Sequence, residues 1–130
     1  MAKAPKPVLD PALTETFLRL RKILEPYAKY MVVKHDGPGI YYLESAPVPK
    51  YGTEVFFGAV QAQKRQVSFH LLPVHVFPEL LETISPALKK RLRGTSRFAF
   101  TTIDAATLRE LAALTKRGYQ GYRRGGVFAA

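Results

Sequence analysis

The chain has 130 residues, no cysteine, and 20 lysine and arginine residues against 10 aspartate and glutamate residues, which gives a formal net charge of +10. This length suits one domain with its own hydrophobic core, and the lack of cysteine excludes disulfides, thiolate metal sites and cysteine nucleophiles. No stretch approaches the roughly 18 apolar residues of a membrane span, so we expect a cytoplasmic protein without a membrane partner. The positive charge favours anionic partners without specifying one.

The first predicted element is a helix that follows a tail. Residues 1–9 contain two prolines and two lysines and are expected to form a flexible tail. Asp10 and Pro11 have the residue types of a helix cap and a first helical position. Apolar residues then recur at spacings of four, three and four, which places them on one face of a helix that ends before Pro26. These residues are Leu13, Phe17, Leu20 and Leu24.

A β-hairpin is predicted next. Residues 30–36 and 40–44 flank a Gly-Pro-Gly turn, whose glycines permit positive φ. A four-residue loop would pair Val32 with Leu43. Both faces of this hairpin mix apolar and polar residues, so the sequence leaves its buried side open.

A second hairpin is predicted over residues 54–63 and 66–72, around a two-residue Lys-Arg loop. In this register one face is apolar or small, and carries Ala62 opposite Val67, Val60 opposite Phe69, and Gly58 opposite Leu71. The other face carries Gln61 with Ser68, Ala59 with His70, and Phe57 with Leu72. Because Lys-Arg is unusual in a tight hairpin turn, a longer loop with a shifted register stays an alternative.

Short helical segments are predicted after the second hairpin. Pro78 starts one that reaches about Thr83. Ser85 and Pro86 have the residue types of a cap and a first helical position, and Gly94 suits the position after a helix end. A helix is therefore expected between Ser85 and Gly94.

A strand and a helix complete the predicted order. Residues 97–101 alternate as in a half-buried strand. Asp104 then caps a final helix over residues 105–117, which Gly118 is expected to end. Residues 119–130 are expected to form a basic tail rich in glycine and arginine.

These elements together predict an α+β fold. Consecutive hairpins favour antiparallel pairing, and the apolar stripes of the two terminal helices need a surface to cover. We therefore expect the N- and C-terminal helices to pack on one face of an antiparallel β-sheet. This single domain is predicted to span residues 10–118.

Several segments resemble the YdhG-like domain of unknown function, a family of small bacterial intracellular proteins. They cover roughly residues 13–122 and read KHDGPGIYYLE, FFGAV, QVSFHLLPV, FPELLETISPALKKRLRG, SRFAF and LRELAALTKRGYQGY. The resemblance implies a frataxin-like fold with two long helices on one face of the sheet, no catalytic motif, and an iron-chaperone role for some members. Iron delivery stays an alternative function, although the first helix offers only Glu15 and Glu25 as carboxylates for a hard cation.

A ligand-binding face of the sheet is the first candidate site. In the predicted second hairpin, Ser68 and His70 share the more polar face, and exposed aromatic residues beside them would favour a ligand or a partner protein. The main prediction is therefore a binding or adaptor domain with its site at Tyr42, Phe57, Ser68 and His70. Core packing explains the aromatic residues equally well.

Catalysis and metal binding receive less support from the same residues. Ser68 and His70 stand two positions apart in a strand, about 7 Å, which is too far for a direct hydrogen bond between nucleophile and base. His70 and His75 point to opposite faces of an extended strand, so they share a metal ion with His35 only if the chain bends sharply. We therefore predict no enzyme activity, no cofactor and no metal site.

Two basic clusters suggest nucleic-acid association as an alternative function. The favoured interpretation of the first is a solvated helix face whose cations complement the helix dipole. The second is interleaved with Tyr119 and Tyr122, an arrangement that suits stacking on single-stranded bases. The clusters consist of Lys89, Lys90, Arg91, Arg93 and Arg97, and of Lys116, Arg117, Arg123 and Arg124.

Overall fold

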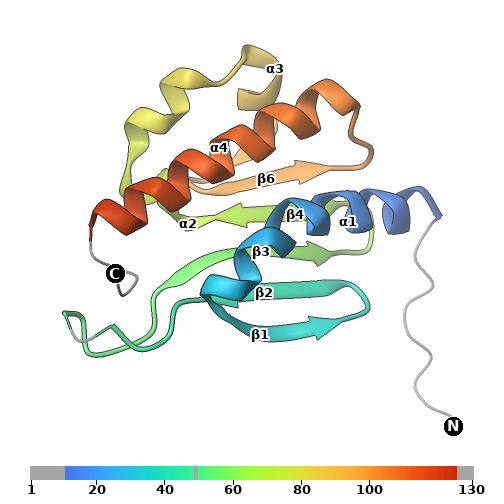
Figure 1. Ribbon diagram of the computed structural model, residues 1–130. Helices are drawn as coiled ribbons and strands as arrows, with labels where there is room; N and C mark the ends of the chain where they lie inside the picture. The colour runs from blue at the N-terminus through green and yellow to red at the C-terminus, as the bar shows by residue number, and fades with distance from the viewer. Residues whose placement is uncertain (1–10, 49, 126–130) are drawn as a thin grey trace, which may run out of the picture.

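The structure is a computed structural model that describes residues 11–48 and 50–125; the expected N-terminal tail, the Asp10 cap and residues 126–130 lie outside this range. Figure 1 shows helices packed against one antiparallel sheet, which confirms the predicted α+β class. In chain order the elements are α1 (Pro11–Leu24), the 3-10 helix η1 (Glu25–Tyr30), β1 (Val32–Gly37), β2 (Ile40–Glu44), β3 (Phe56–Ala62), β4 (Val67–Leu71), α2 (Leu72–Val76), the 3-10 helix η2 (Pro78–Thr83), α3 (Pro86–Lys89), β5 (Leu92–Arg93), β6 (Arg97–Phe100) and α4 (Ala105–Arg124).

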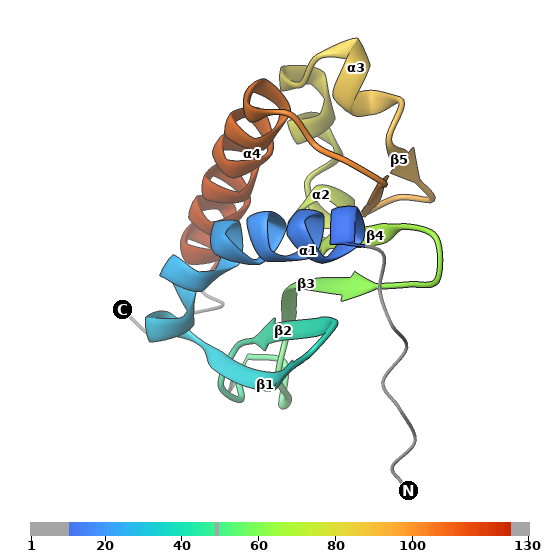
Figure 2. The same ribbon diagram turned by 90° about the vertical axis from the view of Figure 1, so that its right-hand side faces the viewer.

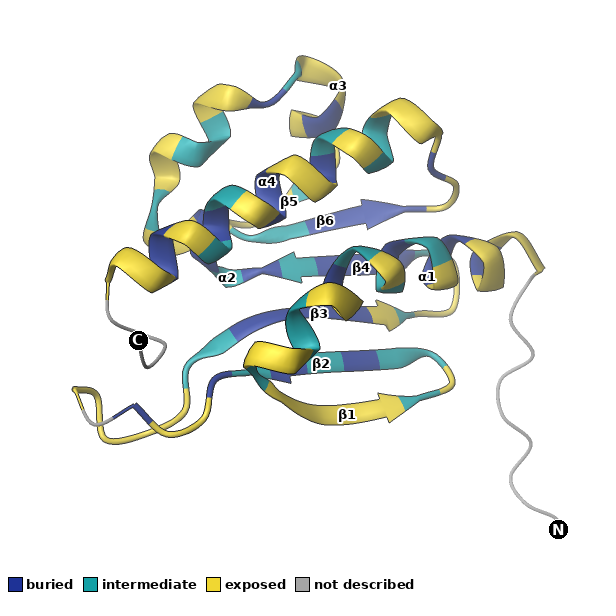
Figure 3. Cartoon of the chain, in the orientation of Figure 1, coloured by how far each residue is buried: buried dark blue, intermediate teal, exposed yellow. Residues whose placement is uncertain are grey.

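The sheet has the strand order β1-β2-β3-β4-β6-β5, and each neighbouring pair is antiparallel. β1 forms one edge and is exposed along nearly all of its length (Figure 3). α1 and α4 lie on the same side of the sheet in both views (Figures 1 and 2), as predicted. No helix in the described part of the chain is long and apolar enough to cross a bilayer.

The predicted apolar stripe of α1 faces the sheet. Leu20 and Leu24 are fully buried, and Leu13 and Phe17 nearly so. A Cβ atom added to Gly58 of β3 would lie 3.2 Å from a methyl carbon of Leu24. A glycine at this position therefore lets α1 approach the strand closely, and the side of the sheet that carries Gly58 is the covered side.

The second hairpin has the predicted register. Its observed pairs are Ala62 with Val67, Val60 with Phe69, Gly58 with Leu71, Gln61 with Ser68, and Ala59 with His70. The backbone N–H of Gln63 donates to the carbonyl of Gln66 at 2.7 Å, so the loop has the two predicted residues. The prediction that Phe57 lies on the more polar face is wrong. A β-bulge in the β2–β3 ladder turns this side chain toward the helices, where it is fully buried.

The first hairpin differs from the expected register. Leu43 pairs with Val33 rather than with Val32. Two residues form the turn, and Gly39 has a φ of +83°, which glycine adopts without strain. A β-bulge between Val33 and His35 adds one residue to β1. The sequence pattern did not reveal this bulge, because both faces of the hairpin are mixed in character.

The helix expected between Ser85 and Gly94 is only one turn long. Ser85 caps α3 as predicted, and its hydroxyl accepts a hydrogen bond from the Leu88 N–H at 3.2 Å. Leu92 instead lies in β5 and pairs with Phe98 of β6. The sheet edge gives this backbone hydrogen-bond partners, and such tertiary pairing overrides a weak local helix preference.

Helix α4 does not end at Gly118, as the sequence suggested, but continues to Arg124. A Cβ atom on Gly118 would lie 2.8 Å from the Cβ atom of Pro73 in α2, and one on Gly121 would lie 2.7 Å from the ring of Phe77. Both glycines therefore allow close packing inside the helix instead of ending it. The first part of the expected C-terminal tail is helical.

Candidate functional site

The side of the sheet opposite α1 and α4 is the open face, since the described helices pack on the other side (Figure 2). Side chains alternate along a strand, so the neighbours of core residues point to the open face. His70 stands between Phe69 and Leu71, which are both fully buried, and is itself half-buried. The predicted outward orientation of His70 therefore fits the structure.

A row of six residues crosses the open face, one from each strand. Each residue pairs with the next across the sheet, so the six side chains point to the same side. Neighbouring strands lie about 4.8 Å apart, which makes the row about 24 Å long. This cross-strand row consists, from β5 to β1, of Arg93, Arg97, His70, Ala59, Tyr42 and His35.

Basic side chains gather at the β5 end of the row. Arg93 is exposed, and its guanidinium group donates to the carbonyl of Lys90 at 2.8 Å. Arg97 is half-buried, with a guanidinium nitrogen 3.4 Å from the hydroxyl of Ser68. Burial first, and the charge of Arg97 second, hold the pKa of His70 below its ordinary 6.5. His70 is therefore mainly neutral near pH 7, and an approaching anion would favour its protonation.

Aromatic rings gather at the other end of the row. The ring of Tyr42 lies 4.7 Å from that of Phe56 and 5.5 Å from that of His35, between centroids. The ammonium group of Lys34 lies 5.9 Å from the Tyr42 ring and 3.7 Å from a carboxylate oxygen of Glu44. Ring faces with a cation beside them suit a ligand that carries a planar group.

The middle of the row is occupied by a small side chain. Ala59 has only a methyl group, is 5% exposed, and lies between His70 and Tyr42. Ser68 and Ala99, which pair with each other beside His70 and Arg97, are also small and buried. A ligand that reaches from His70 to Tyr42 would cross this floor over two strand spacings, about 10 Å.

Phe57 was predicted on this face but belongs to the core. Its ring centroid lies 5.5 Å from that of Tyr27 and 5.9 Å from that of Tyr122. Phe56 takes the expected position beside Tyr42. Two consecutive phenylalanines indicate one ring on each side of a strand, but the bulge decides which ring faces which side.

Ser68 and His70 do not form a nucleophile–base pair. The hydroxyl of Ser68 is fully buried and donates to Oε1 of Gln63 at 3.0 Å. A guanidinium nitrogen of Arg97 donates to the hydroxyl oxygen of Ser68. Within the described residues, no hydrogen bond joins Ser68 to His70.

The three histidines do not come together. His75 lies in helix α2, so the chain does not continue as an extended strand after His70, and a hydrogen bond of 3.1 Å joins the Nδ1 of His75 to the hydroxyl of Thr95. His35 and His70 lie three strand spacings apart, about 14 Å. Across residues 11–48 and 50–125, no group of three or more histidine, cysteine, aspartate or glutamate side chains is placed to hold a metal ion.

The structure divides the first basic cluster between two surfaces. Arg93 and Arg97 lie in the cross-strand row. The other members are exposed at the end of α3 and in the turn that leads to β5; they are Lys89, Lys90 and Arg91.

The second basic cluster lies on α4. The guanidinium group of Arg117 donates to a threonine hydroxyl of η2 at 2.8 Å, and that of Arg123 lies 5.9 Å from the ring of Tyr119. Tyr122 is buried, and its hydroxyl donates to the carbonyl of Phe56 at 2.8 Å, so its ring does not stack on a ligand. The exposed members of the cluster include Lys116 and Arg124.

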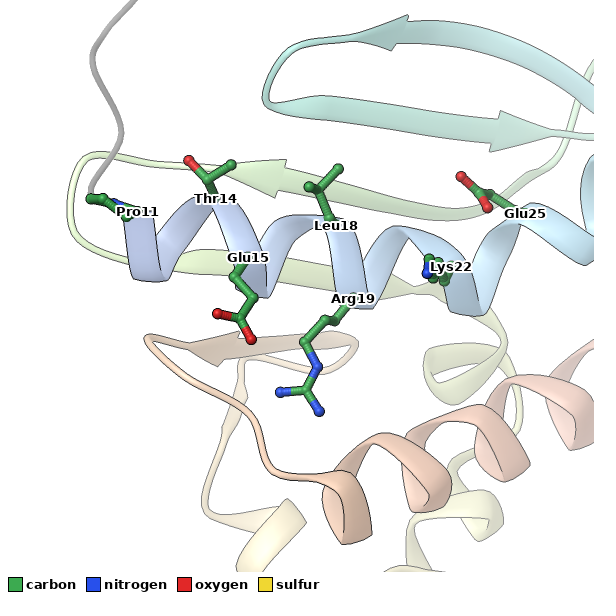
Figure 4. A pocket seen from close by; sticks show the side chains of 7 residues that line it. All are labelled: Pro11, Thr14, Glu15, Leu18, Arg19, Lys22 and Glu25. Carbon is green, nitrogen blue, oxygen red and sulfur yellow. The ribbon is translucent and has the colours of Figure 1, made fainter.

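Cavities lie on the helix side of the described part of the molecule. One of about 640 Å³ runs along α1, where Figure 4 shows Glu15 and Arg19 directed to one side of the helix and Glu25 to the other. A second, of about 500 Å³, lies between α1 and α4 and has Arg19, Lys22 and Arg109 at its border. Neither cavity includes a member of the cross-strand row.

Comparisons with protein-family models, with curated proteins and with solved structures find no match.

Proposed function

We propose that this protein is a non-enzymatic binding domain that holds a phosphate-bearing ligand with a planar ring on its open face. The observation that carries the proposal is the cross-strand row, which has two guanidinium groups at one end, a methyl floor in the middle and Tyr42 beyond it. Guanidinium groups bind phosphate through paired hydrogen bonds, and aromatic rings stack on planar groups. A nucleotide unit has both features.

Binding is favoured over catalysis because Ser68, which lies beside the row, has no base positioned to activate its hydroxyl. A serine nucleophile needs a base within hydrogen-bond reach, whereas the Ser68 hydroxyl is held by Gln63 and is inaccessible. The resemblance to the YdhG-like family stays a prediction, and the lack of a catalytic motif in that family agrees with a binding role.

Arg97→Ala is expected to weaken binding of the dinucleotide ApA roughly tenfold to hundredfold, because a hydrogen bond to a charged group contributes about 1.5–3 kcal/mol. NMR titration of the ¹⁵N-labelled protein gives the affinity, and shift changes should concentrate in β3, β4 and β6. Arg109→Ala, which removes an exposed guanidinium group from α4 on the helix side, should leave the affinity unchanged. Shift changes that concentrate in α1 and α4 would contradict the proposed site.

The affinity for ApA is expected to rise as the pH falls. The charged side chain against His70 is Arg97 of β6, and the facing residue of β3 is the uncharged Ala59. Because the folded protein holds the pKa of His70 below 6.5, the unfolded chain binds this proton more tightly, and the free energy of unfolding falls as the pH drops below 6.5. A bound phosphodiester stabilises the imidazolium, so it offsets this loss of stability, and the affinity for the ligand rises as the pH falls.

Calorimetry between about pH 7.5 and 5.5 tests this coupling, since the diester itself does not titrate there. His70→Gln should abolish the increase in affinity, whereas His75→Gln, which changes an exposed residue of α2 outside the row, should retain it. A wild-type affinity that does not change with pH would show that His70 does not contact the phosphate.

A further inference from the structure

We infer that the ligand of the open face is a single-stranded nucleic acid whose backbone runs across the strands. The inference rests on the proposed function and extends it from one nucleotide unit to several. The side chains along the row and directly beside it alternate in chemical character. From β5 to β1 these are basic, then aromatic, then basic again: Arg93, Arg97 and His70, then Tyr42 and Phe56, then Lys34.

The row is longer than one nucleotide needs. Its six strands span about 24 Å, and domains that bind single strands on a sheet occupy about four nucleotides at the lower end of their range. A single nucleotide would engage the guanidinium end and the aromatic pair but would leave Lys34 unused. Phosphates on both sides of a stacked base would engage both basic ends.

The aromatic pair selects single strands over duplexes. Tyr42 and Phe56 are half-buried in the open face, with ring centroids 4.7 Å apart and planes tilted by 35°. A ring presented on a sheet stacks only on a base whose face is exposed, and in a duplex these faces are covered by neighbouring base pairs. We therefore expect weak binding to duplexes, through phosphate contacts alone.

The charges of the open face complement a phosphodiester backbone. Within the described residues, no carboxylate lies within ion-pair distance of Arg93 or Arg97. Glu44 pairs with Lys34 at 3.7 Å, and hydrogen bonds first, then the charge of Lys34, lower the pKa of the exposed Glu54, so acids partly offset the charge at this end of the row. An acidic protein segment would satisfy the two arginines but would supply no planar group for Tyr42, so the nucleic acid is the better match.

The inference is tested by measuring how the affinity of the protein for a single-stranded oligonucleotide depends on the number of nucleotides. Fluorescence anisotropy of labelled oligodeoxyadenylates from two to eight nucleotides should show a gain of roughly tenfold or more between two and about four nucleotides, because each stacked base adds to the affinity. Beyond about five nucleotides, the gain should be small. A duplex of eight base pairs and a glutamate-rich peptide of equal charge serve as competitors, and both should compete poorly at physiological salt.

Two variants test the aromatic and the basic contacts separately. Phe56→Ala should weaken binding of the tetranucleotide roughly tenfold, whereas Tyr30→Ala removes an exposed ring from η1 and should have no effect. Arg93→Ala should reduce the slope of log affinity against log salt by about 0.7, the value expected for one phosphate contact on a single strand. Arg109→Ala should leave that slope unchanged.

Each contrary result has a defined meaning. If ApA binds at the open face but longer oligonucleotides bind no more tightly, the single-strand inference is wrong while the proposed function holds. If neither binds, both are wrong. If the duplex binds as tightly as the single strand and Phe56→Ala has no effect, the face is an unspecific cationic surface, which overturns the inference. If the acidic peptide displaces the oligonucleotide efficiently, the partner is a protein segment instead.

Discussion

Phe57→Ala is expected to lower the free energy of unfolding by about 3–5 kcal/mol, the range for removing a buried aromatic ring. The Phe57 side chain is fully buried. Its ring centroid lies 5.5 Å from that of Tyr27, 6.3 Å from that of Tyr119 and 5.9 Å from that of Tyr122, so it joins β3 to both η1 and α4. Three rings held by two different elements collapse poorly into the space left by a fourth. Urea unfolding followed by circular dichroism measures the loss.

The adjacent substitution Phe56→Ala is the matched control for this prediction. Phe56 is half-buried on the open face, so its truncation should cost only about 1 kcal/mol of stability while it weakens ligand binding. The pair of variants thus separates a core residue from a site residue at neighbouring positions. Equal losses of stability would show that the bulge does not orient the two rings as described.

Gly118→Val is expected to destabilise the protein by about 3 kcal/mol, at the upper end of the usual range for overpacking. The added Cβ atom would lie 2.8 Å from the Cβ atom and 3.2 Å from the Cγ atom of Pro73. The proline ring has no alternative rotamer that makes room, so α2 and α4 would have to separate. Valine has a better helix propensity than glycine, but this gain is below about 1 kcal/mol and does not offset the clash.

Gln120→Val provides the control on the same helix. Gln120 is exposed, so valine there meets no neighbour and should change the free energy of unfolding by no more than about 0.5 kcal/mol. Both variants are compared by urea unfolding. Wild-type stability of Gly118→Val would contradict the close contact of α4 with α2.

The strongest sequence signals were repeated apolar spacings. The register of the second hairpin was predicted because a slip of one residue would move apolar residues such as Val60 and Phe69 to the polar face. The buried stripe of α1 followed from spacings of three and four residues in the same way. In both elements many residues favour one arrangement together, so no single exception changes the outcome.

The failures occurred at single residues with two local interpretations. Gly118 suits a helix end as well as a close helix contact, and only the position of Pro73 selects the second. Leu92 suits another helical turn as well as a short strand, and β6 selects the strand. Phe57 faces the core because of a bulge that no pattern within β3 indicates. In each case a contact with another element decided the outcome.

The candidate site shows the same division. The sequence indicated Tyr42, Ser68 and His70, but it missed Phe56 and did not place Arg93 and Arg97 beside them. Local patterns indicate which residues of one strand share a face, but not which strands are neighbours. β6 pairs with β4 and carries β5 on its far side, and this order brings the two guanidinium groups into line with His70.

By itself, the sequence determined an α+β protein with a covered and a polar side of its central hairpin, because hydrophobic periodicity acts over neighbouring residues and requires no knowledge of distant ones. Only the tertiary structure decided the strand order, the two bulges and the length of α4. These depend on contacts between different elements, where steric fit and backbone pairing override weak local preferences. The cross-strand row exists only because those contacts align six strands.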